Sequence, residues 1–535
     1  MANVFNSVRV RKPKRNVFDL SCVNKLTCEA GELIPIYWEE MLPSDEFKVA
    51  TANRIRLAPQ ALPVMHNVDV SMYWFFVPMR ILWSKFEEFI TGGKDGTSQP
   101  TFPLFSGFGS TRTSPGTLFD YLGVPHFTGT GVNPRFSAMP VAAYIKIYND
   151  YFRDENLQPE LIFECSDGLN DDSGLAISTQ IGGSSNPYQR GPWKPFLASW
   201  KKDYFTSALP WTQRGNPVRI PLLGNAPINY GDKLSQGNPL MSGAGNPSFI
   251  IAKSSAGGSS PSGNKVAVSG NSTNDNIIYG LEADLSQATS ATINDLRRAF
   301  RLQEFLERNA VGGSRLTEII RAHFGVRSPD ARLQRAEFIG GSTNPVMFEA
   351  VYQNSATQEN APLGDFAGRA MSVGGQKPIK FYAKEHGIFM GIMVIRPRPE
   401  YQDITPRRLL HGLNDKFDFF WPDLAHIGEQ PILNRELYTS GTPVDNEVFG
   451  YTPRYNEYRF HPSETHGEMK TVLKQFHMNR IFNSTPKLNQ QFMNCNPRTD
   501  MFVVQDGNIS DHYWCEILIG NRAKRPVPKF GTPMI

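Results

Sequence analysis

The chain has 535 residues with a net charge of +4; 20% of them are charged and 12% aromatic, and 45 Gly and 40 Pro are present. This composition excludes a disordered protein and favours a β-rich globular one with long loops. Two to four domains are expected from the length, although one large β domain with inserted loops also reaches this size.

The cysteines exclude two further classes. Their number is odd and no C-x-x-C pair is present, so neither a disulfide framework nor a zinc ribbon is supported. We interpret them as reduced thiols of a protein made in a cytosol: Cys22, Cys28, Cys165, Cys495 and Cys515. The first eighteen residues lack the apolar region of a signal peptide, and no apolar run approaches the length of a bilayer span. A soluble protein without membrane insertion is therefore expected.

The positive charge is concentrated at the two ends of the chain. A basic N-terminal arm (1–18) and a basic C-terminal tail (520–535) contain no acidic residue, whereas the rest of the chain has a net charge of −5. Basic segments of this kind bind nucleic acid without reading its sequence. The alternative is that both segments only solubilise the ends. The candidate nucleic-acid-binding residues are Arg9, Arg11, Lys12, Lys14, Arg15, Arg522, Lys524, Arg525 and Lys529.

The first β-like runs lie at 33–38, 54–57 and 68–77. In the third run, one face is apolar throughout, from Val68 to Phe76, while the opposite face is polar up to Ser71 and apolar from Tyr73 to Val77. Pro78 ends the strand because proline cannot donate to a ladder. A half-buried strand thus becomes buried on both faces, and its second face needs a cover.

A short amphipathic helix is predicted directly after this strand. Leu82, Phe86, Phe89 and Ile90 share one helical face, and the two glycines at 92–93 stop the helix. This helix, or an adjoining subunit, is the candidate cover for the second face of the strand.

Three more helices are predicted further along the chain. The first, at 140–153, carries an aromatic stripe that we interpret as core. The second, at 294–309, is expected to turn Leu296, Phe300 and Leu306 inward. The third, at 315–324, is terminated by a glycine.

The segment 224–280 marks the clearest change of composition. Of its 57 residues, 10 are Gly, 10 are Ser and 8 are Asn, so it cannot bury much apolar surface by itself. Two short β-like runs, 249–251 and 266–268, lie within it and could be ordered by a neighbouring subunit. We interpret the segment as a long surface insertion, because loops of this length are commonly functional or disordered.

The C-terminal third returns to β-like runs, at 381–383, 389–396, 501–504 and 514–519. No phosphate-binding loop, complete dinucleotide-binding fingerprint, nucleophile elbow or zinc-protease motif is present, so neither an enzyme nor a cofactor is expected. His461 and His466 flank Glu464, but Pro462 disfavours a shared helical face, and no metal site is expected there.

Seven stretches in order along the chain resemble the major capsid protein of the gokushovirus branch of the Microviridae, small icosahedral bacteriophages with circular single-stranded DNA. The resemblance covers essentially the whole length. It rests on YWFFVPMRILW (73–83), YNDYFRDENLQ (148–158), KKDYFTSALPW (201–211), ATINDLRRAFRLQEFLERNAVGGSRLTEIIRAHFGVRSPDARLQR (291–335), HGIFMGIMVIRPRPEY (386–401), FGYTPRYNEYR (449–459) and KRPVPKFGTPMI (524–535).

The resemblance implies a mainly β protein, in which residues 19–535 form a single eight-stranded antiparallel viral jelly roll, a β-sandwich, with long inserted loops and a few short helices. It implies a homo-oligomer of about 60 copies that closes into a T=1 icosahedral shell. One long insertion projects in that family and is linked to attachment to a receptor on the bacterial host surface, and 224–280 lies in the corresponding place. The subunit would be assembled in the host cytoplasm and become part of the virion.

Charge arithmetic adds one partner. Nine terminal charges on each of about 60 copies give roughly 540 positive charges, far fewer than the phosphates of a genome of thousands of nucleotides. A small basic DNA-condensing protein is therefore expected beside the packaged single-stranded DNA. Contacts with that DNA would combine phosphate pairing with stacking on aromatic residues such as Phe5, Phe18 and Phe530.

Two alternatives to a capsid subunit stay open at this point. One is a carbohydrate-binding or carbohydrate-active β-sandwich protein, which the missing catalytic constellations disfavour. The other is a basic-armed single-stranded-DNA-binding protein, which the net negative body disfavours. Uniform closed particles would separate the capsid hypothesis from both.

Overall fold

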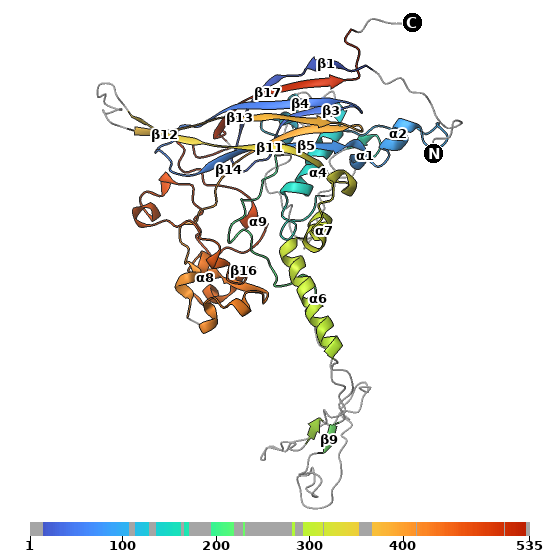
Figure 1. The fold of residues 1–535 in the computed structure, drawn as a ribbon. Helices are drawn as coiled ribbons and strands as arrows, with labels where there is room; N and C mark the ends of the chain where they lie inside the picture. The colour runs from blue at the N-terminus through green and yellow to red at the C-terminus, as the bar shows by residue number, and fades with distance from the viewer. Residues whose placement is uncertain are drawn as a thin grey trace, which may run out of the picture. The chain divides into compact units, whose positions relative to one another are not determined.

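The fold comes from a computed structural model (Figure 1). It describes residues 14–105, 113–127, 135–161, 165–170, 194–218, 228–230, 281–283, 293–313, 315–352, 366–412, 415–507 and 509–530. The chain divides into two compact units, residues 1–214 with 307–535 and residues 215–306. The larger unit contains two antiparallel β-sheets, which we call sheet I and sheet II.

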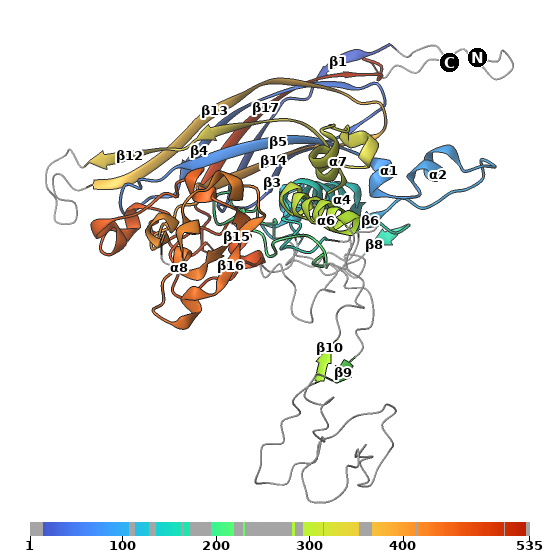
Figure 2. The ribbon, with the colours of Figure 1, turned by 60° about the horizontal axis from the view of Figure 1, so that its bottom comes forward.

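Sheet I has six strands and joins the two ends of the chain. Its order is β1-β17-β4-β13-β12, and β2 also pairs with β17, beyond the end of β1. Every pair is antiparallel, and β4, β13 and β17 run side by side in Figure 2. The strands are β1 (Asn16–Asp19), β2 (Cys22–Cys28), β4 (Glu46–Leu57), β12 (Met347–Tyr352), β13 (Phe366–Tyr382) and β17 (Tyr513–Arg525).

Sheet II has four antiparallel strands in the order β11-β5-β14-β3. These are β3 (Ile34–Met41), β5 (Val68–Pro78), β11 (Glu337–Pro345) and β14 (Gly387–Pro397). The strand predicted at 68–77 is therefore confirmed as β5. The runs at 33–38, 54–57, 381–383, 389–396 and 514–519 are confirmed as parts of β3, β4, β13, β14 and β17.

The main hydrophobic core lies between the two sheets. The face of β5 from Val68 to Phe76 contributes to it as predicted, together with inward residues of β4 and β17 such as Phe47 and Ile517. At its centre the indole of Trp74 stacks on Phe389, with ring centroids 5.2 Å apart. This layer joins the two sheets into a sandwich.

The second face of β5 is buried within the same chain. The ring of Phe75 lies 4.9 Å from that of Tyr151, and Tyr73 lies 5.6 Å from Phe152. Both partners belong to η2 (Tyr148–Phe152), a π-helical turn that continues α4 (Met139–Ile147). The aromatic stripe at 140–153 is thus core, as predicted, and this element supplies the rings that cover Tyr73 and Phe75.

The helix predicted around Leu82–Ile90 is split into α1 (Met79–Leu82) and α2 (Phe86–Thr91), the latter ending at Gly92 in the left-handed region (φ 75°). Leu82 and Phe86 join the core over sheet II, but Phe89 and Ile90 are exposed. The prediction of one buried apolar face across all four residues is wrong: within α2 only Phe86 is buried, while Phe89 keeps ring contacts with Trp83 and Phe102.

The helices α6 (Ile293–Gly312) and α7 (Leu316–Phe324) confirm the two later helix predictions. The inward orientation predicted for Leu296 and Phe300 is wrong, since these residues are 37% and 66% exposed. Before α6, the short strands β9 (Ile228–Tyr230) and β10 (Leu281–Ala283) form an antiparallel pair. The rest of the insertion 224–280, with its runs at 249–251 and 266–268, lies outside the described residues.

Residues 398–512 form a third region with a separate hydrophobic cluster around Tyr401, Ile432 and Phe492. Figure 2 shows α8, β15 and β16 together in it. The strand predicted at 501–504 is wrong: Phe502 makes one isolated bridge to Gln60, and its side chain is buried in the sandwich core instead of following a ladder. The regular elements here are β15 (Glu429–Leu433), α8 (Asn434–Leu437), β16 (Val448–Pro453) and α9 (Gln490–Met493).

The remaining elements are short. They are β6 (Leu104–Phe105), β7 (Phe136–Ser137), β8 (Leu169–Asn170), α3 (Leu118–Tyr121) and the single turns η4 (Asp330–Leu333), η5 (Arg407–Leu410), η6 (Lys416–Asp418), η7 (Pro422–Leu424), η8 (Pro443–Asn446), η9 (Asn456–Tyr458), η10 (Gly467–Lys470) and η11 (Lys474–Phe476). Among the helices of the described residues, none combines the length and the apolar character that crossing a lipid bilayer requires.

Candidate functional site

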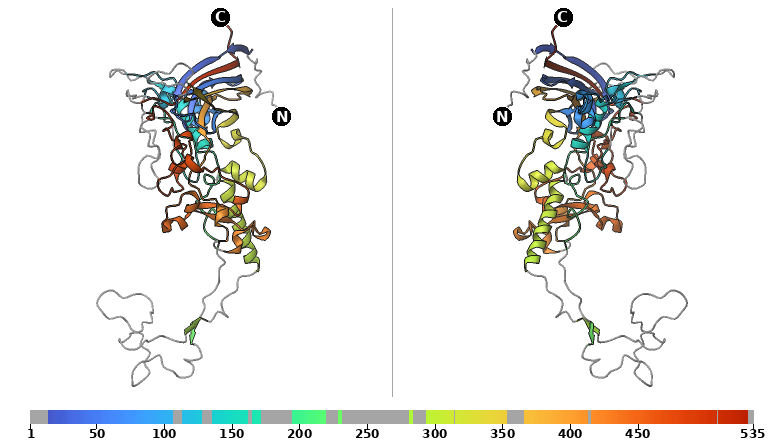
Figure 3. Two further views of the ribbon diagram at one scale, coloured as in Figure 1. Left: turned by 90° about the vertical axis from the view of Figure 1, so that its left-hand side faces the viewer. Right: turned by 90° about the vertical axis from the view of Figure 1, so that its right-hand side faces the viewer.

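The outer face of sheet I carries several basic side chains. Along β4 and β17 every second side chain points into the core, and the intervening ones, such as Lys48, Arg54 and Arg522, are exposed. Figure 3 shows β1, β17 and β4 at one end of this unit, away from the orange residues of the 400–500 region. We call this outer face the basic face.

One row of the basic face places like charges side by side. The register pairs Asp19 with Arg522, Arg522 with Lys48, and Lys48 with Lys380, across four neighbouring strands. All four side chains are exposed. Like charges directly opposite each other in an antiparallel sheet destabilise it. A bound polyanion would remove this cost, whereas a basic partner would increase it.

The two ends of the chain meet at this row. Strand β1 pairs with the last four residues of β17, from Asn16 opposite Arg525 to Asp19 opposite Arg522. Five of the predicted basic residues lie near this pairing and are exposed: Lys14, Arg15, Arg522, Lys524 and Lys529. The sequence prediction put them in two separate segments, and the structure brings them to one end of sheet I. Arg9, Arg11 and Lys12 lie outside the described residues.

Part of the predicted C-terminal tail is strand. Residues 520–525 form the end of β17 because they continue its alternation of inward and outward side chains. Arg525 does not fit the prediction of a DNA-facing arm. Its guanidinium lies 3.0 Å from the buried carboxylate of Asp45 and 3.1 Å from Glu39, and its side chain is only 15% exposed. Arg525 therefore holds the strand end to the loop before β4.

Arg15 is also engaged by the fold. Its guanidinium donates a 3.2 Å hydrogen bond to the carbonyl of Ser44 and lies 3.6 Å from Glu46. The same guanidinium lies 5.7 Å from the centre of the Tyr382 ring. Arg15 thus anchors the start of β1. Lys14, the residue before it, is exposed and forms no ion pair with a carboxylate of the described residues.

The other half of the basic face contains residues that the sequence analysis missed. In adjacent rows, Glu516 lies opposite Lys25 on one side and Arg54 on the other, and Trp514 lies opposite Arg56. Arg54 and Glu516 form a 2.8 Å ion pair. The alternation of residues 46–57 could have placed Arg54 and Arg56 on one face of a strand. It is interrupted by polar residues at 51 and 53, which point inward, so the strand could not be recognised from the sequence.

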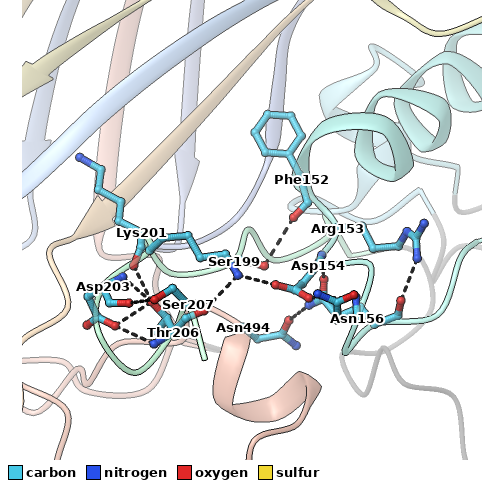
Figure 4. Close-up of polar contacts among 12 residues, drawn as sticks. Phe152, Arg153, Asp154, Asn156, Ser199, Lys201, Asp203, Thr206, Ser207 and Asn494 are labelled. Atoms are coloured by element: carbon cyan, nitrogen blue, oxygen red, sulfur yellow. Dashed lines mark hydrogen bonds and ion pairs between the residues drawn. The ribbon is translucent and has the colours of Figure 1, made fainter. Parts of the chain in front are cut away.

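Polar contacts join the motif at 148–158 to the segment that leads into the motif at 201–211 (Figure 4). The Ser199 hydroxyl donates to the Phe152 carbonyl at 3.4 Å, and Lys202 pairs with Asp154. Asp203 accepts hydrogen bonds from the backbone amide and hydroxyl of the buried Thr206, each at 2.7 Å. These contacts fix the segments 152–156 and 199–207 beneath sheet II, which explains motifs at these positions by packing rather than catalysis.

The guanidinium of Arg408 lies between His461 and Glu464, where the sequence analysis considered a metal site. Arg408 lies 3.0 Å from Glu464 and also contacts His461, and His466 lies 3.2 Å from the second oxygen of Glu464. A fixed positive charge already balances this carboxylate. Within the described residues no group of three potential metal ligands is found.

Comparison with known proteins decides between the open alternatives. The family model described as capsid protein (F protein) matches residues 6–535. Capsid protein VP1 of Bdellovibrio phage phiMH2K is 35% identical over 97% of this chain and 95% of its own length. VP1 of Chlamydia phage 1 is 31% identical over 100% and 98%, and VP1 of Spiroplasma virus 4 is 30% identical over 94% and 92%.

The chain belongs to this family of capsid proteins. The resemblance to the gokushovirus branch of the Microviridae is confirmed. The protein is a structural component of a virion and not an enzyme, and it assembles with copies of itself into a shell. Exposed faces of the subunit must therefore be divided among neighbouring copies and the inner and outer sides of the shell.

Proposed function

We propose that the chain is the major capsid subunit of a single-stranded DNA phage, with a jelly-roll body, and that about 60 copies close a T=1 shell. The strand order supports the jelly roll. Numbering β2, β3, β4, β5, β11, β13, β14 and β17 from one to eight, sheet I contains 1-8-3-6 and sheet II is 2-7-4-5. This alternation between two four-stranded sheets is the double Greek-key connectivity of viral jelly rolls.

The basic face is proposed to line the interior of the shell, against the packaged DNA. The observation that carries this step is the row of Arg522, Lys48 and Lys380, whose mutual repulsion a phosphate backbone would relieve. The convergence of Lys14, Lys524 and Lys529 on the same end of sheet I supports it. In this arrangement the nine basic terminal residues proposed from sequence act with the sheet, except that Arg525 and Arg15 serve mainly as anchors.

The insertion 224–280 is proposed to project from the shell and contact a receptor on the bacterial host. Its Gly-, Ser- and Asn-rich composition supports an exposed role, because such a segment buries little apolar surface. A small basic DNA-condensing protein is proposed as a further partner, since the subunit charges cannot neutralise a genome of thousands of nucleotides. Both proposals rest on composition and charge.

Assembly is tested by producing the full-length chain in a bacterial host and examining the particles by cryo-electron microscopy. We expect uniform closed shells with icosahedral symmetry and 60 copies of this subunit. Filaments or beads along DNA would favour the dedicated DNA-binding protein instead. A monomer that binds or hydrolyses sugars would favour the carbohydrate hypothesis.

The orientation of the shell is tested with charge reversal. Replacing Lys48 and Lys380 together by Glu removes two central cations of the row, and we expect particles of normal size with less packaged DNA. The matched control is Lys487→Glu, an exposed lysine in the 398–512 region that belongs to no strand of sheet I. Equal DNA content in the double variant and the parent would contradict an interior basic face.

The role of the insertion is tested by a deletion. Deletion of 235–275 should leave assembly intact and reduce adsorption to the host.

A further inference from the structure

A groove opens at the end of sheet I that is remote from β1. It has a volume of about 880 Å³, within the range of about 300–1,000 Å³ typical of small-molecule sites. Strands β2, β4 and β17 and the segment around α3 line it. The side chains that decide its chemistry are Lys25, Arg54, Arg56, Tyr121 and Trp514.

An aromatic ring in this groove is held in place while remaining accessible. The indole nitrogen of Trp514 donates a 3.2 Å hydrogen bond to the carbonyl of Asp511, and the side chain stays 43% exposed. A large exposed aromatic ring with a fixed orientation is a poor surface residue for an isolated domain. It is a suitable platform for a planar ring, such as a nucleobase.

Cations surround this ring at positions that suit a phosphate backbone. Arg56 lies directly opposite Trp514 in the register, and Lys25 lies opposite Glu516 in the next row. No described carboxylate forms an ion pair with Arg56 or Lys25, whereas Glu516 is already paired with Arg54. The remaining carboxylate in the lining, Asp120, accepts a 3.0 Å hydrogen bond from the backbone amide of Gly116. Two cations are therefore available to an anion.

The groove and the basic row lie on the same outer face of sheet I, toward the two ends of β17. Trp514 and Arg522 belong to the same strand and are eight residues apart, which corresponds to about 27 Å along an antiparallel strand. Between them the outward residues are Glu516, Leu518 and Gly520 on β17 and Arg54, Ala52 and Ala50 on β4, so a short uncharged stretch separates the groove from the row. Single-stranded nucleic acid sites commonly cover about 4–16 nucleotides and combine a cationic track with stacking rings. The basic face offers a stacking ring with cations at one end of β17 and a row of cations at the other.

We infer that this groove binds one nucleotide of the packaged single strand, with the base stacked on Trp514 and the neighbouring phosphates paired with Arg56 and Lys25. The inference rests on the proposed function, since it assigns a local contact to the same interior face. Stacking accepts every base because each has a flat aromatic surface, so the contact is independent of sequence. Phosphate pairing makes it sensitive to salt.

Two other occupants of the groove are less suitable than single-stranded DNA. A neighbouring copy of the subunit would have to bury Arg56 and Lys25, and burying unpaired cations is costly. A basic DNA-condensing protein would be repelled by the same cations. Single-stranded DNA supplies both the rings and the negative charge, and it is therefore the occupant that we propose.

The test uses DNA-filled particles of the full-length chain. Ultraviolet cross-linking followed by digestion and mass spectrometry should find nucleotide adducts on the peptide that contains Trp514. Trp514→Ala should lower the adduct yield in this region, including at Tyr121, on the order of tenfold, and Trp514→Phe should restore much of it because a stacking surface is kept. Trp421→Ala is the matched control, since Trp421 is similarly exposed but lies in the 398–512 region.

A second measurement keeps this inference separate from the proposed function. Binding of a fluorescein-labelled oligothymidylate of 12 nucleotides to the unassembled full-length chain should weaken in Trp514→Ala and in Arg56→Glu, and should be unchanged in Trp421→Ala. Failure of the parent to form closed shells would contradict the proposed shell while leaving this binding measurable. Unchanged oligonucleotide binding in both groove variants, or density of a neighbouring subunit in the groove of intact particles, would overturn the inference.

Discussion

The two sheets of the sandwich differ in what covers their outer faces. On sheet II, the chain's own insertions supply the cover, with Tyr144 and Tyr148 fully buried over the outer side of β5 and β14. On sheet I, the outer face is left exposed and carries charges and a few apolar residues such as Leu518. The side-chain pattern of a strand thus indicates whether its outer face is buried, but not which segment buries it. A strand with two apolar faces has its cover in the fold, while a face rich in like charges indicates a partner outside the chain.

The largest expected effect concerns the covered face of sheet II. Phe75 is 1% exposed and packs against Tyr151, Phe152 and Phe338. Phe75→Ala should lower the free energy of unfolding by about 3–5 kcal/mol, because it removes a buried ring and leaves a cavity. Urea unfolding of the unassembled chain, followed by tryptophan fluorescence, measures this change. A loss below about 1 kcal/mol would show that the insertions pack loosely on this sheet.

A smaller effect is expected where an insertion is tied to sheet II by charge. The Asp69 carboxylate accepts hydrogen bonds from Lys201 and, at 3.2 Å, from Arg398. Burial opposes ionisation, but these two hydrogen bonds outweigh it and lower the pKa of Asp69 below its ordinary value of 3.8. Asp69→Asn should therefore cost about 1–2 kcal/mol at neutral pH, since both cations are partly exposed.

The pH dependence of Asp69→Asn provides its control. A lowered pKa in the folded state contributes stability that is present above the ordinary pKa and is lost as the pH falls through the folded value. The difference between Asp69→Asn and the parent should accordingly shrink toward pH 3. A difference that stays constant from pH 7 to pH 3 would assign the effect to shape instead of charge.

The 398–512 region should respond to pH in the opposite direction. Burial, assisted by the nearby Glu307, raises the pKa of Glu429 from its ordinary value of 4.5 to about 7. The folded state therefore holds a proton that the unfolded state releases, and stability falls as the pH rises from about 4.5 to 7. Glu429→Gln should raise the unfolding free energy by about 1–2 kcal/mol at pH 8, after allowance for partial exposure.

The matched control for Glu429 is Glu468→Gln, which changes an exposed carboxylate in the same region. Thermal unfolding of both variants at pH 4.5 and pH 8 measures the difference. We expect Glu429→Gln and the parent to converge at pH 4.5, and Glu468→Gln to follow the parent at both values. A stabilisation by Glu429→Gln that is equal at both pH values would contradict the raised pKa.

The smallest effect on stability is expected on the exposed face of sheet I. Leu518 lies at the middle of β17 and is 49% exposed. Leu518→Ser should change the unfolding free energy by less than about 0.5 kcal/mol, as for other exposed substitutions. If the loss in urea unfolding approaches that of Phe75→Ala, a segment of the chain itself covers sheet I and the comparison of the two sheets fails.

The sequence was sufficient to predict the elements whose pattern is uniform. The strand at 68–77 and the aromatic stripe at 140–153 follow from periodicity, because apolar residues repeat without interruption. Most of β4 was missed, because Thr51 and Asn53 are buried inward-facing residues of the strand and interrupt its apolar alternation. In α6, Phe300 was placed inward because an amphipathic pattern does not say whether a neighbour is present.

The candidate site was predicted only in its charge, not in its geometry. The basic ends were visible in the sequence, but their convergence depends on the pairing of β1 with β17, whose partners are about 500 residues apart. The row of Lys48, Lys380 and Arg522 requires the register of three strands that are distant in sequence. Such register is set by long-range pairing that local patterns do not contain.

The position of β17 has a consequence for the order of synthesis. This strand lies between β2 and β4, although Tyr513 pairs with Cys28 and Leu57, which precede it by more than 450 residues, so sheet I stays incomplete until β17 is made. Contacts of such high sequence separation form late and slowly. A growing chain on the ribosome therefore cannot present a finished basic face, because Arg522 and Trp514 lie on this last strand. Until then, the edges of β2 and β4 that pair with β17 stay open, and open strand edges favour aggregation.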